Sequence, residues 1–176
     1  MSSAPTPIRL TPADAERYLR LRDGMLRDAP WAFDAAPAGD AELDLGRVAA
    51  SFASERAATF AIEAPPSPED AGRPALIAAA SITRSEGPKF SHRARISAVF
   101  VHPSHRGRGL GRAVIGAAID AARGWGVDYA DLGVSENSPE ALRLYESFGF
   151  RTWGREPEAT EHNGRRYDEI HMTLRL

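Results

Sequence analysis

Short stretches in which apolar residues alternate with polar ones, or cluster as β-branched and aromatic residues, predict the strands of a sheet. The stretch 58–64 alternates, and 94–103 is rich in β-branched and aromatic residues and ends at a proline. The predicted strands, in chain order, are 7–10, 58–64, 75–84, 94–103, 127–134, 151–156 and 167–176. The proline-rich stretch 65–74 is predicted to be a surface loop.

Apolar residues that recur at helical spacing predict four helices, at 12–28, 43–56, 109–126 and 138–150. The first follows Thr11, a capping residue, with Asp14 as the acid of a capping box. The last opens with Ser138 as a cap and Pro139 in the first helical position, and Gly149 marks its end.

The predicted order is β-α-α-β-β-β-α-β-α-β-β. Consecutive strands favour antiparallel pairing, and the later alternation of strand and helix favours parallel crossovers. We therefore expect a single mixed α/β domain over 1–176, with a largely antiparallel central sheet of about seven strands flanked by about four helices. Residues 1–6 are expected to be disordered.

Composition narrows the class of protein. The 176 residues are 43% apolar, with a net charge of −2 and no cysteine. A general nucleic-acid binder would carry a basic excess, and thiol chemistry or a cysteine-based zinc site is impossible. The N-terminus lacks the features of a signal peptide, and no apolar run is long enough to cross a membrane. We expect a cytoplasmic protein without a nucleic-acid or membrane partner.

Residues 106–111, Arg-Gly-Arg-Gly-Leu-Gly, lie between a predicted strand and a predicted helix. A helix N-terminus exposes unpaired N–H groups and the positive end of its dipole, and glycines let the backbone come close to a ligand. The stretch therefore predicts a phosphate site. A basic turn without a ligand is the alternative. The dinucleotide pattern fails because Val114 replaces its third glycine, and the P-loop pattern fails because no Lys-Ser/Thr pair follows.

The pattern that fits is Arg-x-x-Gly-x-Gly, at Arg106, Gly109 and Gly111. It resembles the acetyl-CoA pyrophosphate loop of the Gcn5-related N-acetyltransferase (GNAT) family. The match extends upstream and downstream through "VFVHPSHRGRGLGRAVI" and "ALRLYESFGF". The resemblance is specific over about 94–176 and looser over 7–64.

The resemblance implies the fold of that family, acetyl-CoA as cosubstrate, and transfer of its acetyl group to a primary amine by direct attack in a ternary complex. The acceptor would be a small molecule or a protein amino group, and a homodimer is a further option because dimers are frequent in the family. A non-catalytic acyl-CoA-binding sensor on the same fold is the alternative, since fold does not determine function.

The resemblance also implies roles for individual residues. Tyr145 would be the general acid, although a tyrosine on an apolar helix face is usually a core residue. The backbone N–H of Val101 would be the oxyanion donor. Either Asn137 or Ser138 would contact the pantetheine arm. The remaining implied cofactor contacts are Val99, Phe100, Val101, Arg106, Gly107, Arg108, Gly109, Leu110, Gly111 and Arg112.

The general base stays open. The strand before the loop offers no carboxylate, and the candidates are Glu86, Glu136, Glu169 or a chain of water molecules. Each of these acids is also typical of a solvated surface.

For the acceptor, the resemblance points to Trp31 and Phe33, beside an acidic loop that would suit a cationic amine. That loop carries Asp34, Asp40, Glu42 and Asp44. An ordinary solvated loop is the alternative. No metal site is expected, because His102 and His105 flank a proline in a loop while His162 and His171 stand alone in the sequence.

Overall fold

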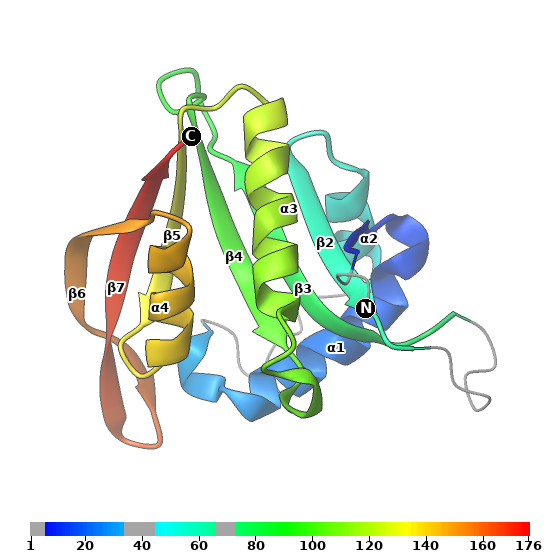
Figure 1. The fold of residues 1–176 in the computed structure, drawn as a ribbon, viewed down its shortest axis with the longest axis horizontal. Helices are drawn as coiled ribbons and strands as arrows, with labels where there is room; N and C mark the ends of the chain where they lie inside the picture. Colours follow the sequence, from blue (N-terminus) through cyan, green and yellow to red (C-terminus); the bar gives the residue numbers. More distant parts are fainter. Residues whose placement is uncertain (1–5, 34–44, 66–72) are drawn as a thin grey trace.

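The computed structural model describes residues 6–33, 45–65 and 73–176 (Figure 1). The strands are β1 (Ile8–Arg9), β2 (Ala57–Glu63), β3 (Leu76–Arg84), β4 (Arg93–Val101), β5 (Tyr129–Ser135), β6 (Arg151–His162) and β7 (Arg165–Arg175). The helices are α1 (Ala15–Asp28), α2 (Leu45–Ala53), α3 (Leu110–Gly124) and α4 (Pro139–Ser147), with short 3₁₀ turns η1 (Pro12–Asp14), η2 (Pro30–Ala32) and η3 (Pro103–His105).

The strands form one seven-stranded sheet in the order β1-β2-β3-β4-β5-β7-β6. Every neighbouring pair is antiparallel except β4 and β5, which are parallel. Helices α3 and α4 cover one face, and α1 and α2 cover the other (Figure 1). The predicted element order and the mixed, largely antiparallel sheet are confirmed. None of the helices in the described ranges is long and apolar enough to cross a membrane.

The sheet separates two apolar cores. Alternate residues of β3 point to opposite faces, so that Ala78 and Ile82 pack with α3 whereas Ala79 packs with α1 and α2. Val114 and Ile115 of α3 are fully buried in the first core. Burying an aliphatic side chain of this size stabilises the fold by about 1.5–3 kcal/mol.

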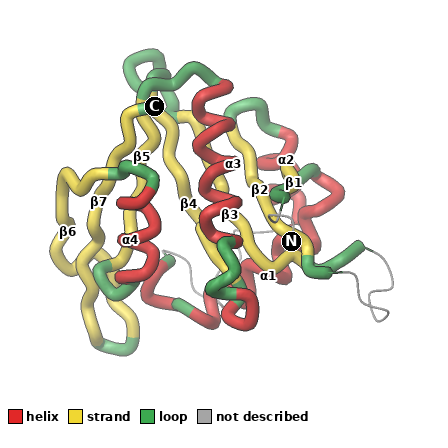
Figure 2. The backbone as a smooth tube through the Cα atoms, in the orientation of Figure 1, coloured by secondary structure: helices red, strands yellow, loops and turns green. Residues whose placement is uncertain are grey.

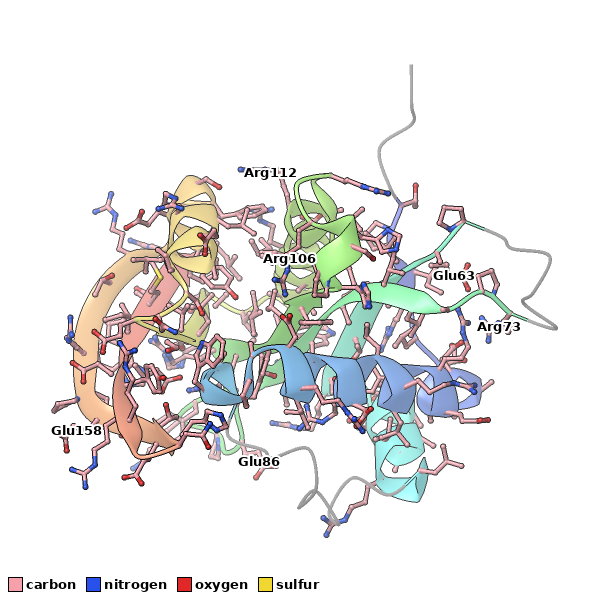
Figure 3. All side chains as sticks on the ribbon, turned by 90° about the horizontal axis from the view of Figure 1, so that it is seen from below. Glu63, Arg73, Glu86, Arg106, Arg112 and Glu158 are labelled. Atoms are coloured by element: carbon pink, nitrogen blue, oxygen red, sulfur yellow. The ribbon has the colours of Figure 1, made fainter. Side chains whose placement is uncertain are left out.

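The first helix begins as predicted. The Asp14 carboxylate accepts a hydrogen bond from the Thr11 N–H at 2.9 Å and is almost completely buried. It also pairs with Arg17 at 3.0 Å and with Arg73 at 2.6 Å, and Arg17 reaches Glu63 at 2.6 Å (Figure 3). Burial by itself would raise the pKa of Asp14, but the Thr11 hydrogen bonds and the two arginines lower the pKa below 3.8.

Strand β6 is longer than predicted, with 12 residues. The predicted strand ended at 156, just before Pro157. β6 is the edge of the sheet, where proline is tolerated. The hairpin closes through Asn163 and Gly164, with φ of 52° and 71°. Positive φ at both central residues is the geometry of the tight turn that joins antiparallel strands.

β4 and β5 pair only at their first residues and then separate. The register joins Arg93 to Tyr129 and ends at Arg95 and Asp131, although both strands continue (Figure 2). The β3–β4 ladder is irregular between Ala79 and Ser81, and Ala98 there has φ of 50°. A bulge of this kind bends its strand. The sheet therefore opens between β4 and β5.

Candidate functional site

A cavity of about 170 Å³ lies where β4 and β5 separate. Its lining combines both faces of the sheet. The residues are Ala32, Phe33, Arg95, Ile96, Ser97, Ala98, Val99, Gly133, Val134, Ser135, Ser138, Ala141, Tyr145 and Glu169.

Tyr145 reaches this cavity from α4. It is 5% exposed and its ring lies 5.9 Å from that of Phe150. Its hydroxyl makes no hydrogen bond with any other residue in the described ranges. Burial raises the pKa of Tyr145 far above its ordinary value, so that the hydroxyl stays protonated. The group is therefore a neutral proton donor that faces the opening.

Glu169 reaches the same cavity from the opposite face of the sheet. On β7, Ile170 and Met172 pack with the α3–α4 core, and Glu169 therefore points to the other face. Its carboxylate lies directly over Gly133 of β5, where an added Cβ would be 2.0 Å from Oε1. The carboxylate can occupy this position because Gly133 has no side chain.

The other two acids proposed as bases lie elsewhere. Glu86 is exposed on the turn between β3 and β4, on the far side of the molecule from Arg112 (Figure 3). Glu136 pairs with Arg155 at 2.6 Å and accepts a hydrogen bond from the Asp168 N–H at 3.1 Å. Of the three acids, Glu169 alone lines the cavity.

The glycine loop has the backbone expected of a phosphate site. Gly107 and Gly109 have φ of 75° and 78°, and an added Cβ at either would meet open space. The first helical bond of α3 runs from the Ala113 N–H to the Gly109 carbonyl at 3.1 Å. The N–H groups of Leu110, Gly111 and Arg112 precede that bond and have no acceptor within the helix. They can hold an anion.

Gly111 has a different task. An added Cβ there would lie 3.2 Å from Leu144 and 3.5 Å from Val101. Leu110 is buried in the core beside it. Gly111 therefore lets the first turn of α3 pack closely against α4 and β4.

The three arginines of the loop are not equivalent. Arg106 is tied down by an ion pair with Asp28 and by a 3.1 Å bond from its Nε to the Val101 carbonyl. Arg112 donates to Ser147 at 2.6 Å, which joins α3 to α4 (Figure 3). Arg108 is exposed. Two of the three therefore hold the loop in place.

The last residues of β4 lead from the loop into the cavity. Val99 lines the cavity, whereas Phe100 is buried against α1 and α2. The His102 N–H donates to the Ile77 carbonyl at 2.8 Å. This bond makes Val101 and Ala78 a non-hydrogen-bonded pair, so that the Val101 N–H points away from β3, toward the separated edge.

Ser138 and Asn137 differ in position. Ser138 lines the cavity and occupies the N-cap of α4, but its hydroxyl makes no capping bond. Asn137 is exposed and its N–H donates to the Ser135 hydroxyl at 3.3 Å. The structure therefore brings Ser138, rather than Asn137, to the opening.

Phe33 and Trp31 differ in the same way. Phe33 lines the cavity. The Trp31 carbonyl accepts from Thr160 at 3.3 Å and its ring lies 6.4 Å from that of Tyr167, so that it fastens η2 to the β6–β7 hairpin. The acidic loop with Asp34, Asp40, Glu42 and Asp44 lies outside the described residues.

A second cavity of about 410 Å³ lies between the sheet and helices α1 and α2. It shares Ser97 and Ala98 with the first cavity, so that the two meet at the β4 bulge. Across its floor, Thr59, Ser81 and Ser97 occupy matching positions on β2, β3 and β4, with 2.8 Å between the first two hydroxyls. The walls include Tyr18, Arg22, Arg47, Val48, Ser51 and Phe52.

In the sequence His171 stands alone, but in the structure it has acidic neighbours. The β6–β7 pairing brings Glu156 and Glu169 beside it, with ligand atoms within 4.8 Å of one another. These residues could hold a cation, and the predicted absence of a metal stays a prediction. The signal that was missed is Asn163-Gly164, which predicts a hairpin and hence the side-by-side placement of these strands.

Comparison with known proteins identifies the family. A family model described as the acetyltransferase (GNAT) family matches residues 25–150. The chain belongs to the GNAT family. It is 36% identical over 78 residues to the L-amino acid N-acyltransferase MnaT of Escherichia coli, a match that covers 44% of this chain and 45% of the relative. It is equally similar, over 46% of the relative, to the L-methionine sulfoximine/L-methionine sulfone acetyltransferase of Salmonella typhimurium. The match thus spans about half the length of these curated relatives.

Solved structures share the GNAT fold. The yncA protein of Salmonella typhimurium, solved with its cofactor acetyl-CoA, has a TM-score of 0.80 and 24% identity over 99% of this chain and 95% of that one. A phosphinothricin acetyltransferase of Sinorhizobium meliloti, also in complex with acetyl-CoA, has a TM-score of 0.80 and 17% identity over 98% and 89%. The predicted fold class and family are confirmed.

Proposed function

We propose that the protein transfers the acetyl group of acetyl-CoA to the amino group of a small acceptor that carries an acid group. One observation carries the proposal: Tyr145 and Glu169 approach the same opening in the sheet from opposite faces. A proton donor on one side and a proton acceptor on the other are what acyl transfer between a thiol and an amine requires.

Acetyl-CoA suits the residues along its proposed path. The N–H groups of residues 107–112, with two positive-φ glycines, are a cradle for its pyrophosphate. Val99 and Ser138 lie next along the opening, where the pantetheine arm would follow. When bound, acetyl-CoA supplies the thioester carbonyl that the amine attacks.

The chain's own residues supply the remaining chemistry. Glu169 takes a proton from the acceptor nitrogen, the Val101 N–H stabilises negative charge on the carbonyl oxygen, and Tyr145 protonates the leaving sulfur. A protein that only senses acyl-CoA would need no acid and base on opposite sides of the opening. Their presence disfavours the non-catalytic alternative.

The second cavity supports the class of acceptor. It opens on the Glu169 side of the sheet, and its described lining combines Arg22 and Arg47 with the hydroxyl residues Thr59, Ser81 and Ser97. Arginine and hydroxyl donors favour a carboxylate or a similar anion. Two relatives are named for acyl transfer to L-amino acids and to methionine analogues, which are amines with an acid group.

The test is amine-dependent release of free thiol from acetyl-CoA, after calorimetry has measured acetyl-CoA binding. L-amino acids are compared with the matching amines that lack the carboxylate. We expect turnover of the acids and at least a tenfold lower kcat/KM for the amines, with the difference reduced in Arg47→Gln. Equal rates for both series would refute the acid-bearing acceptor. No acetyl-CoA binding would refute the proposal entirely.

A cytoplasmic location, expected from the sequence, and a homodimer, an option implied by the family resemblance, stay predictions. Fractionation of cells and light scattering of the purified protein would test them.

A further inference from the structure

A row of side chains leads from the opening in the sheet to solvent. In the β6–β7 register Glu156 lies opposite Glu169, and Gly154 lies opposite His171. His171 Nε2 is 3.1 Å from a Glu156 oxygen and 3.8 Å from a Glu169 oxygen. Side-chain exposure is 27% at Glu169, 19% at His171 and 57% at Glu156. The row therefore begins at the cavity and ends in water.

The tryptophan of β6 covers the middle of this row. Thr152 pairs with Met172 and Gly154 pairs with His171, so that Trp153 is the extra residue of a bulge. Its ring is stacked on that of His171 at 5.4 Å and 27°. The stacking fixes the plane of the imidazole and screens it from solvent on that side.

We propose that His171 relays the proton taken up by Glu169 to Glu156, and from there to solvent. This inference rests on the proposed function. His171 acts through Glu169 and is a positioning residue, not a group that touches the substrate. The same ring nitrogen faces both carboxylates, at hydrogen-bond distance from Glu156 and 3.8 Å from Glu169, a gap that one bridging water or a small side-chain movement closes. The proton can then enter and leave at Nε2 without a change at Nδ1.

The protons balance. An acceptor ammonium gives one proton to Glu169, and its nitrogen then forms the C–N bond as the C–S bond breaks. Tyr145 protonates the departing thiolate, and a second nitrogen proton restores Tyr145. The products are the amide, the free thiol and one proton, which leaves through His171 and Glu156. The relay speeds the return of Glu169 to the carboxylate form that starts the next turnover.

The test is a chemical rescue. The kcat of His171→Ala is measured by thiol release at low buffer concentration, then with imidazole added. We expect kcat to fall at least tenfold while the KM for both substrates stays within about twofold. Imidazole restores kcat in His171→Ala but not in Glu169→Gln, because a diffusible base replaces the relay and not the first acceptor. Glu156→Gln shows a smaller loss.

The matched control is His162→Ala, in the same hairpin, whose Nε2 lies 3.1 Å from Asn163 and contacts neither acid. It should keep the wild-type kcat. A wild-type kcat in His171→Ala at low buffer overturns the relay. So does a loss that imidazole cannot restore, which identifies a structural role.

A metal at Glu156, Glu169 and His171 is a separate outcome. Loss of wild-type turnover with a chelator and its recovery with Zn²⁺ would overturn the relay. Failure of the proposed function is distinct from all of these, because the wild-type protein would then release no thiol with any amine.

Discussion

The variant Gly133→Ala tests the position of the Glu169 carboxylate without substituting Glu169. The added Cβ would lie 2.0 Å from Oε1, 2.5 Å from Cδ and 3.1 Å from Cγ of Glu169. Ordinary contacts of this kind need about 3.5 Å, so the carboxylate must move by more than about 1 Å. The atoms in the way are the end of a flexible side chain, and the fold should accommodate them.

The expected result is a selective loss of activity. A displacement of about 1 Å from a catalytic geometry costs about 10²-fold. We therefore expect kcat to fall about 10²-fold, equivalent to about 2.7 kcal/mol. Stability should stay the same or rise by about 0.4–1 kcal/mol, because alanine restricts the unfolded chain. The assays are thiol release and urea denaturation.

The double variant with Glu169→Gln decides the interpretation. If Gly133→Ala acts through Glu169, it adds almost nothing once the carboxylate is gone. If Gly133→Ala lowered kcat by the same factor in the wild-type protein and in Glu169→Gln, the effect could not act through the Glu169 carboxylate. Gly116→Ala in α3, whose added Cβ would contact nothing, is the control and should behave as wild type.

Three further outcomes follow from the structure. Tyr145→Phe should lower kcat about 10²-fold with little change in Tm. Because burial raises the pKa of Tyr145 far above 10.0, ionisation of its hydroxyl should not lower the wild-type rate at any pH up to 10. A rate loss from that ionisation would contradict the burial of Tyr145. Gly109→Val should lower acetyl-CoA affinity at least tenfold by calorimetry, since φ of 78° costs a β-branched residue about 1–2 kcal/mol and moves the cradle; unchanged affinity would exclude the loop as the anion site. Asp14→Asn should cost about 3 kcal/mol at pH 7 in urea denaturation. The pKa of Asp14 is lowered on folding from 3.8, so that the wild-type advantage is present above that value and shrinks as the pH falls below it; a constant difference down to pH 3 would contradict this.

Local signals made much of the fold predictable. Alternation and helical spacing are properties of neighbouring residues, and they located the strands and helices within a few positions, apart from the second half of β6. The capping box at Thr11 and Asp14 and the glycine after α4 were predictable for the same reason. So was the glycine loop, because its turn geometry depends on residues 107 and 109 themselves.

The position of the proposed base was not predictable, because Glu169 reaches the opening through the pairing of β7 with β5, which are distant in the sequence. Its neighbour Glu156 was not predictable either, because a bulge sets the register of the β6–β7 hairpin. Asn163-Gly164 sets the hairpin, and Thr160 pairs with Tyr167 as the turn requires. Counting on from that turn would place Glu158 opposite Glu169. The irregularity between Glu156 and Thr160, with Glu158 at φ of 51°, shifts the register by two residues and places Glu156 there instead. No local sequence pattern predicts such a bulge.

For a similar reason, the sequence could not decide whether Asn137 or Ser138 reaches the opening. Both precede α4, and only the folded structure shows that Ser138 lines the cavity whereas Asn137 is exposed. Ala98 is a further case, since an alanine with φ of 50° in a strand cannot be inferred from its residue type.

The most direct test of the account compares wild type with the double variant Tyr145→Phe/Glu169→Gln. Calorimetry first shows whether both proteins bind acetyl-CoA, and mass spectrometry then measures the N-acetylated product formed from an L-amino acid. We expect both proteins to bind acetyl-CoA equally, wild type to form as much product as the acetyl-CoA it consumes, and the double variant to form almost none. Product formation at the wild-type rate by the double variant would contradict it.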